Sequence, residues 1–170
     1  MKLQEKNLFT ALSVLTGLFT AFSFPKMNLF FLMWAALVPL FYVICRSSVK
    51  QSFFYAFLAG LAAHMHGVFF VLDSIFLLTD SYITALFFYI VLCLYFSLYW
   101  GVWGALVSFI KRLNAKPLVF VFISASLWIL LEYTRTYVLT GWPWTLLGYS
   151  QYLFTYIQLE IGRASCRERV

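Results

Sequence analysis

Charged residues are scarce in this chain, and cysteine and proline are scarcer still. Only 11% of the 170 residues are charged, whereas 64% are hydrophobic and the mean hydropathy is +0.89. A water-soluble domain could not cover that much apolar side chain with polar surface, so soluble classes are excluded. Strict alternation of apolar and polar residues is also absent, which leaves helices as the spanning structure. We therefore predict an all-α integral membrane protein.

Apolar runs recur along the chain, each about the length needed to span the hydrocarbon core, which is roughly 20 helical residues for about 30 Å. Short polar or proline-containing breaks separate them, such as Pro25 to Asn28 and Lys111 to Pro117. The fourth run exceeds a perpendicular crossing, so we expect it to tilt or overhang. Residues Ile75 to Leu78, between Asp73 and Asp80, are predicted to form an interfacial turn. The predicted polytopic bundle has about five transmembrane helices, at residues 8–24, 29–45, 53–72, 82–110 and 118–139, and an interfacial aromatic element at 141–159.

Basic residues are spread unevenly over the predicted loops. Seven of them fall on one side of the membrane, whereas Lys26 lies alone in a loop on the other side. By the positive-inside rule the amino terminus is cytoplasmic, and the segment after the fifth helix is outside. The net charge of +6 is then a matter of topology, so we expect no nucleic-acid partner. The seven residues are Lys2, Lys6, Arg46, Lys50, Lys111, Arg112 and Lys116.

The two ends of the chain need separate interpretations. A cleaved signal peptide ending near Ala21 to Ser23 is the alternative for the amino terminus, but bulky Phe22 and Phe24 beside that position favour an uncleaved helix. From Glu160 the sequence becomes polar and loses its periodicity. The string from 160 to 170 resembles an in-frame translation of a sequencing-library adapter. We therefore treat residues 160–170 as a non-native tail and expect the natural protein to continue beyond residue 159.

Neither the cysteines nor the histidines predict a reactive or metal centre. Cys45 and Cys93 lie within predicted helices and Cys166 lies in the suspect tail, so we expect packing roles and no disulfide or zinc site. His64 and His66 are two residues apart and therefore face different sides of one helix. No neighbouring acidic residue or cysteine completes a coordination shell. We expect no metal and no cofactor; helix–helix hydrogen bonds or a polar cavity explain the histidines, with a metal site or proton relay as the alternative.

Residues 131–151 carry the most informative pattern. Glu132 and Arg135 stand at i and i+3 at the end of the fifth helix, so they share a face and can neutralise each other at the edge of the hydrocarbon. Beyond Gly141, the wedge Trp142–Trp144 is suited to headgroup depth, with its proline fixing both indoles. An aromatic belt alone is the alternative, but the coincidence with polar neighbours favours a lipid-binding site. The predicted lipid-binding residues are Glu132, Arg135, Gly141, Trp142, Pro143, Trp144, Tyr149 and Gln151.

Several motifs together resemble those of the apolipoprotein N-acyltransferase family. Ser23-Phe-Pro25 is similar to the family's turn after the first helix, and Trp34-Ala-Ala-Leu-Val-Pro-Leu40 to its second helix. A glycine-containing third helix ends near Asp73, and the longest match runs from Leu131 through Gln151. The resemblance covers residues 1 to about 159, which is the first part of a family member. The chain departs from the family pattern at three positions. The family commonly has tryptophan, glycine and phenylalanine, respectively, where this chain has Phe70, Thr136 and Trp142.

The resemblance implies a two-step acyl transfer at the bacterial inner membrane. A cysteine thiolate would take an acyl chain from a phospholipid, usually phosphatidylethanolamine, and pass it to the amino group of a diacylglyceryl-apolipoprotein. The family carries this out with a Glu-Lys-Cys triad in a periplasmic nitrilase-like domain, which is missing here. We therefore expect no catalytic residue in this chain and no activity from it alone. It would supply the membrane and lipid-access part, with the Trp142–Trp144 segment periplasmic.

The spacing of small residues in the fourth helix does not predict self-association. Gly101 and Gly104 are three residues apart, whereas the dimerisation pattern of membrane helices needs a separation of four. We therefore expect a monomer.

A membrane transporter or channel subunit is the alternative function. His64 and His66 would then line a polar path, and Glu132 with Arg135 would form a gate pair. Such a protein is expected to show further intramembrane charges or paired broken helices, and the sequence shows neither clearly. A purely structural membrane scaffold is a third option. A covalent acyl-enzyme in the full-length protein would separate an enzyme from both.

Overall fold

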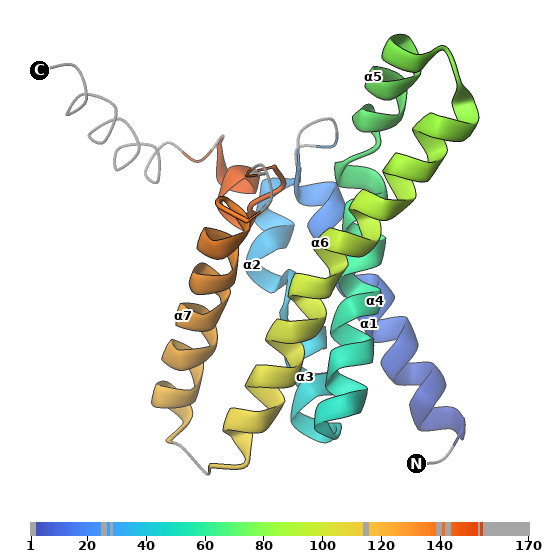
Figure 1. The fold of residues 1–170 in the computed structure, drawn as a ribbon. Helices are drawn as coiled ribbons and strands as arrows, with labels where there is room; N and C mark the ends of the chain where they lie inside the picture. Colours follow the sequence, from blue (N-terminus) through green and yellow to red (C-terminus); the bar gives the residue numbers. More distant parts are fainter. Residues whose placement is uncertain are drawn as a thin grey trace, which may run out of the picture.

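The computed structural model describes residues 3–24, 27, 29–113, 116–138, 141, 144–152 and 154. Within these residues all regular structure is helical, as the composition predicts. Figure 1 shows the helices gathered into one bundle, with α5 and the adjoining end of α6 projecting beyond it. In chain order the elements are α1 (Leu3–Ser23), η1 (Phe30–Leu32), α2 (Met33–Ala36), α3 (Val38–Arg46), α4 (Val49–Gly67), α5 (Phe70–Thr79), α6 (Tyr82–Lys111), α7 (Pro117–Arg135) and η2 (Leu147–Gln151).

The second predicted helix, residues 29–45, is divided into the three pieces η1, α2 and α3. Leu37 lies between α2 and α3, and Pro39 follows in the first turn of α3. A proline is tolerated there because the first amides of a helix have no intrahelical partner. The division therefore falls where proline allows a helix to begin.

The third predicted helix is bent rather than straight. α4 ends at Gly67, α5 begins at Phe70, and the two axes differ by 58°. The predicted turn at Ile75 to Leu78 is wrong, because these residues belong to α5, while their interfacial position stays a prediction. The chain reverses only at Asp80, whose φ of 51° lies in the left-handed region, and Ser81 then caps the first turn of α6.

Two helices, α6 and α7, are long and apolar enough to cross a membrane, and the bent pair α4–α5 would make a third crossing if it acts as one broken span. The number of five crossings stays a prediction. α6 has 30 residues and is therefore about 45 Å long, well beyond a hydrocarbon core of about 30 Å. One end of α6 projects from the bundle together with α5 (Figure 1), and its tilt or overhang relative to the membrane stays a prediction.

Small residues let α1, α4 and α6 approach closely at the centre of the bundle. A Cβ atom added at Gly104 would lie 2.7 Å from the Ser52 carbonyl oxygen, and one added at Gly60 would lie 2.7 Å from the Trp100 ring. One at Gly17 would overlap the Ala59 carbonyl oxygen. Close approach of this kind gives dispersion contacts, which replace the hydrophobic effect inside a bilayer. The largest buried cluster consists of Leu40, Ile44, Ala56, Ala59, Ala63, Trp100, Trp103 and Val107.

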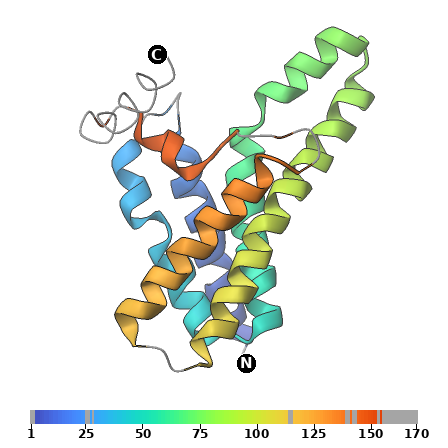
Figure 2. The ribbon, with the colours of Figure 1, turned by 60° about the vertical axis from the view of Figure 1, so that its left-hand side comes forward.

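Figures 1 and 2 place the start of α1, the α3–α4 turn and the α6–α7 turn at the same end of the bundle, which we call the basic end. The Nζ atom of Lys111 donates there to the carbonyl oxygens of Ile44, Cys45 and Ser47, at 3.3, 2.9 and 3.3 Å. The opposite end, which carries η2, is called the loop end below. Lys2 and Lys26 lie outside the described residues. The other predicted cytoplasmic basic residues, which belong to the basic end, are Lys6, Arg46, Lys50, Lys111, Arg112 and Lys116.

Candidate functional site

The candidate site lies at the loop end, where the chain leaves α7 and returns to η2. We call the connection the α7–η2 loop, residues 136–146, of which 139, 140, 142 and 143 lie outside the described residues. Gly141 has a φ of 70°, and a Cβ atom there would lie 2.5 Å from the Thr136 carbonyl oxygen. Only glycine adopts this close, left-handed turn without strain. Gly141 therefore allows the backbone conformation of this loop. Its contact with lipid, which the sequence predicts, stays a prediction.

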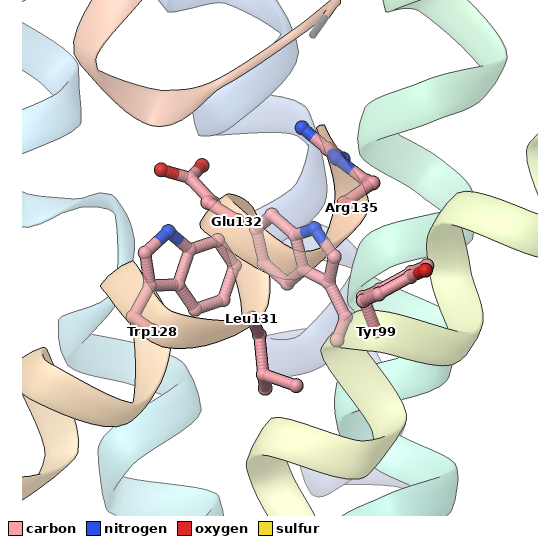
Figure 3. Close-up of a pocket in the computed structure, with 6 residues that line it drawn as sticks. Tyr99, Trp128, Leu131, Glu132 and Arg135 are labelled. Atoms are coloured by element: carbon pink, nitrogen blue, oxygen red, sulfur yellow. The ribbon is translucent and has the colours of Figure 1, made fainter. Parts of the chain in front are cut away.

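Glu132 and Arg135 each bind the backbone of the returning chain. The Glu132 carboxylate accepts a hydrogen bond from the Leu147 amide at 2.8 Å, and Arg135 Nη2 donates to the Trp144 carbonyl oxygen at 2.9 Å. Figure 3 shows the carboxylate and the guanidinium on the same helix end but pointing apart. The shared face follows from their spacing, and each charge also makes a charge-assisted hydrogen bond to the loop backbone. Mutual neutralisation of the two charges stays a prediction.

Arg135 is buried although it carries a charge. Only 3% of its surface is exposed, and its guanidinium carbon lies 5.0 Å from the centroid of the Phe96 ring. An aromatic face attracts a desolvated cation, and this contact offsets part of the cost of removing the charge from water. The Nε atom has no hydrogen-bond partner. Arg135 is thus held by one loop carbonyl and one ring, at the end of the helix.

A small pocket of about 10 Å³ lies between α6 and α7 beside these charges. Trp128 forms one wall, with Leu131 below and Tyr99 of α6 opposite (Figure 3). Trp128 stands perpendicular to two indoles of α6, 4.9 Å from Trp100 and 5.1 Å from Trp103 between ring centroids. Edge-to-face pairs of this kind favour fixed ring positions. The wall of the pocket is therefore set by a tryptophan cluster that joins α7 to α6.

The α7–η2 loop also packs against the bend between α4 and α5. The Trp144 and Phe70 rings lie 5.0 Å apart, and a Cβ atom at Gly67 would lie 2.8 Å from Thr145 Cγ2. Thr145 itself has a φ of 55°, which is rare for a β-branched residue. The loop is thus fitted to the bend at close range. Trp142 and Pro143, the other two members of the predicted wedge, lie outside the described residues.

The last two predicted site residues have different environments. Gln151 is buried, and its Nε2 atom donates to the Phe30 carbonyl oxygen at 2.9 Å, which ties η2 to η1. Tyr149 is exposed on η2. Gln151 therefore holds the end of the loop in place, and Tyr149 remains accessible at the loop end.

The site includes residues that the sequence did not single out for it. Phe96, Tyr99 and Trp128 surround the charges, and Gly67 with Phe70 receives the loop. Sequence periodicity identifies such residues only as apolar positions of a helix. The one available signal was the density of aromatics in α6 and α7, which indicates packing but not which rings meet.

The two histidines lie on different faces of α4, as their spacing predicts. His64 is buried; its Nδ1 atom lies 2.7 Å from the Gly60 carbonyl oxygen, and its ring is 5.2 Å from Phe96. His66 is half-buried. In the part of the chain that the structure describes, no three His, Cys, Asp or Glu side chains are grouped closely enough to hold a metal ion. His64 acts as a packing residue bonded to its own helix.

Comparison with known proteins gives consistent matches for the sequence. Residues 16–160 match the model of the apolipoprotein N-acyltransferase N-terminal domain. The chain is 32% identical over 142 residues to an apolipoprotein N-acyltransferase of Geobacter metallireducens, and 30% identical over 146 residues to one of Photobacterium profundum. These alignments cover 83% and 82% of this chain but 27% of each relative. The chain thus spans about a quarter of the length of the relatives that it matches.

Proposed function

This chain belongs to the apolipoprotein N-acyltransferase family, and we propose that it forms the amino-terminal membrane part of an enzyme that transfers a phospholipid acyl chain to a diacylglyceryl-apolipoprotein. The family match carries this proposal. The acyl transfer itself would require the Glu, Lys and Cys of a nitrilase-like domain, in which a base activates the thiol and a cation stabilises the oxyanion. Those residues belong to the remainder of the enzyme, so this part alone would be inactive.

The proposed location is the inner membrane of a bacterium, with the amino terminus in the cytoplasm and the α7–η2 loop in the periplasm. The grouping of basic residues at one end of the bundle supports this orientation, because positive loops remain on the cytoplasmic side. The five predicted crossings would put the two ends of this segment on opposite sides of the membrane. The loop end then faces the compartment in which the catalytic domain would act.

The loop end would present lipid to the catalytic domain. The observation that supports this role is the pair of hydrogen bonds from Glu132 and Arg135, which hold the loop backbone at Leu147 and Trp144. A fixed loop keeps the exposed part of the Trp144 indole at one place, at a depth where tryptophan is favoured. We propose that Trp142, Pro143, Trp144 and Tyr149 contact acyl chains or glycerol, while the two charged residues position them.

Replacement of Trp144 by alanine in the full-length enzyme tests this role. Loss of the indole should weaken the apparent affinity for the phospholipid donor or the lipoprotein acceptor by about tenfold, or about 1.4 kcal/mol, with less effect on the maximal rate. The measurement is the rate of N-acylation of a diacylglyceryl peptide at graded lipid concentrations. Trp34→Ala, which removes an indole that is 70% exposed on α2, is the matched control. Unchanged affinity for both lipids would show that the loop has no part in lipid presentation.

Detection of the covalent acyl-enzyme separates this function from the transporter alternative. The full-length protein, mixed with a phospholipid carrying a labelled acyl chain and no acceptor, should retain the label in a hydroxylamine-sensitive thioester. A transporter or scaffold would form no such bond. The environment of His64, which is packed against Phe96 and bonded within α4, gives no support to a polar path.

A further inference from the structure

An apolar groove of about 270 Å³ runs along α7, on the other side of Trp128 from the pocket at Glu132. Trp103 of α6 lines it together with Phe41 of α3, while Val121 and Ile129 line it from α7. The volume is near the lower limit of clefts that hold small ligands. No described segment of the chain occupies it.

The chemistry of the lining excludes a polar occupant. Ser124 is the hydroxyl-bearing residue of the groove, and its hydroxyl donates to the Phe120 carbonyl oxygen at 2.7 Å. The Ser124 carbonyl oxygen in turn accepts from the Trp103 indole at 2.9 Å. Both groups are already satisfied within the protein, and a buried polar ligand without partners would be costly. The groove therefore suits a saturated hydrocarbon segment, such as an alkyl chain.

The polar surroundings lie at one end of the groove. Trp128 lines both the groove and the pocket that contains Glu132 and Arg135. Leu147, which also lines the groove, has its amide bonded to the Glu132 carboxylate. At the other end, toward Phe41 and Val121, the lining is apolar. An occupant with one polar and one apolar end would thus place its polar end toward the loop end of the bundle.

We propose that this groove binds one acyl chain of a membrane phospholipid, with the lipid's polar end beside Glu132 and its chain directed toward the bilayer centre. The proposal rests on the proposed function only for the orientation of the membrane. From Val121 to Ile129 the groove extends about 12 Å at 1.5 Å per residue, which is within one leaflet of a hydrocarbon core of about 30 Å.

The binding cannot come from the hydrophobic effect, because bulk lipid tails are as apolar as the groove. It comes from close contact with the Trp128 indole and with the exposed side chains of Val121 and Ile129, which line the groove. This lipid is separate from any lipid held by the Trp142–Trp144 segment, since the groove lies along the helix below the loop. It therefore adds a second lipid contact to the membrane part.

Photocrosslinking of the full-length enzyme tests the proposal. The protein is placed in vesicles of phosphatidylethanolamine and phosphatidylglycerol that contain a phospholipid with a diazirine in the middle of one chain, and the adducts are mapped by peptide mass spectrometry. Ala125→Trp would fill the groove from α7, while Ser126→Trp places the same bulk on a neighbouring exposed position outside it. We expect adducts on the groove residues in the wild type and in Ser126→Trp, and their loss in Ala125→Trp.

Three outcomes would overturn the proposal. Adducts that persist in Ala125→Trp, or that spread evenly over all exposed faces of α7, would show ordinary contact with the bilayer. Absence of groove adducts in the wild type would show that another part of the enzyme covers the groove. Acyl-enzyme formation, followed on the same wild-type sample, reports separately on the proposed function, so the two can fail independently.

A second variant protects the test against misfolding. Ala125→Cys changes little in size and can be modified after folding with an alkyl methanethiosulfonate, with Ser126→Cys as its control. Modification at position 125 should remove the groove adducts, and modification at position 126 should leave them. Adducts that survive complete modification at position 125 would contradict the proposal, as would a position 125 thiol that the reagent cannot reach.

Discussion

The centre of the bundle and α7 are held in place by opposite means. Between α4 and α6, glycine and alanine bring two backbones together, and at Gly104 a single added carbon would collide with α4. In α7 the buried residues are Ser124 and Arg135, and most of the helix surface is exposed. The centre therefore gains stability from continuous close packing, whereas α7 depends on a few specific contacts near its loop end.

This difference places the candidate site where packing is weakest. The pocket at Glu132 and the apolar groove both lie against α7, and Trp128 separates them. A helix held by a tryptophan cluster and two charged anchors leaves the groove beside it, where we propose that a lipid binds. A helix packed like α4 or α6 would leave no groove.

The first substitution, Gly104→Ala, acts on the tightly packed centre. Its Cβ atom would lie 2.5 Å from Ala56 Cβ and 2.7 Å from the Ser52 carbonyl oxygen, so α4 and α6 must move apart. We expect the free energy of unfolding of the full-length protein in mixed micelles to fall by about 3 kcal/mol, although alanine is the better helix former. Gly148→Ala is the control, because a Cβ atom there meets nothing within 4 Å. Equal effects of the two substitutions would refute the close-packing account.

The second substitution, Arg135→Met, acts on the anchor of the loop. It removes the hydrogen bond to the Trp144 carbonyl oxygen, but it also removes a buried charge. We expect amide exchange of the segment around residues 144–152 to become about thirtyfold faster, for a local loss of about 2 kcal/mol, with a smaller fall in global stability because the Glu132 carboxylate loses its neighbouring cation. The measurement is hydrogen exchange by mass spectrometry. A large fall in global stability without faster loop exchange would place Arg135 in the core rather than in the loop anchor.

The third substitution, Glu132→Gln, keeps an acceptor for the Leu147 amide and removes only the charge. The hydrogen bond should persist in weaker form, so we expect about fivefold faster exchange at the start of η2, or about 1 kcal/mol. Exchange in the α4–α6 core is the internal reference and should not change. Equal exchange in Glu132→Gln and wild type would mean that the carboxylate's charge contributes nothing to the anchor.

The sequence predicts the helical class and most helix positions, because apolar run length and short polar breaks are local properties. It does not predict the bend between α4 and α5. That stretch is apolar without interruption from Val68 to Leu72, and the bend is fitted to Trp144 and Thr145, which come far later in the chain. A long-range fit of this kind leaves no local signal.

The candidate site was predictable in its location but not in its contacts. The spacing of Glu132 and Arg135 correctly places both on one helix end, and the motif places the loop beside them. Their partners are backbone groups of Trp144 and Leu147, whose positions depend on the loop conformation. The spacing of these two side chains suggests an ion pair. It carries no information on the backbone groups of the later loop, which also bind them. The roles of Trp142 and Pro143 stay predictions.

The Lys111 contact at the basic end has a consequence for biogenesis. Its ammonium group reaches the carbonyl oxygen of Ser47, 64 residues earlier in the chain. At a synthesis rate of about 5 to 20 residues per second, the ribosome needs about 3 to 13 seconds to deliver the second partner after the first. The α3–α4 turn is therefore synthesised seconds before the lysine that binds it. The later half of the chain thus supplies the side chain that joins α6 to the α3–α4 turn.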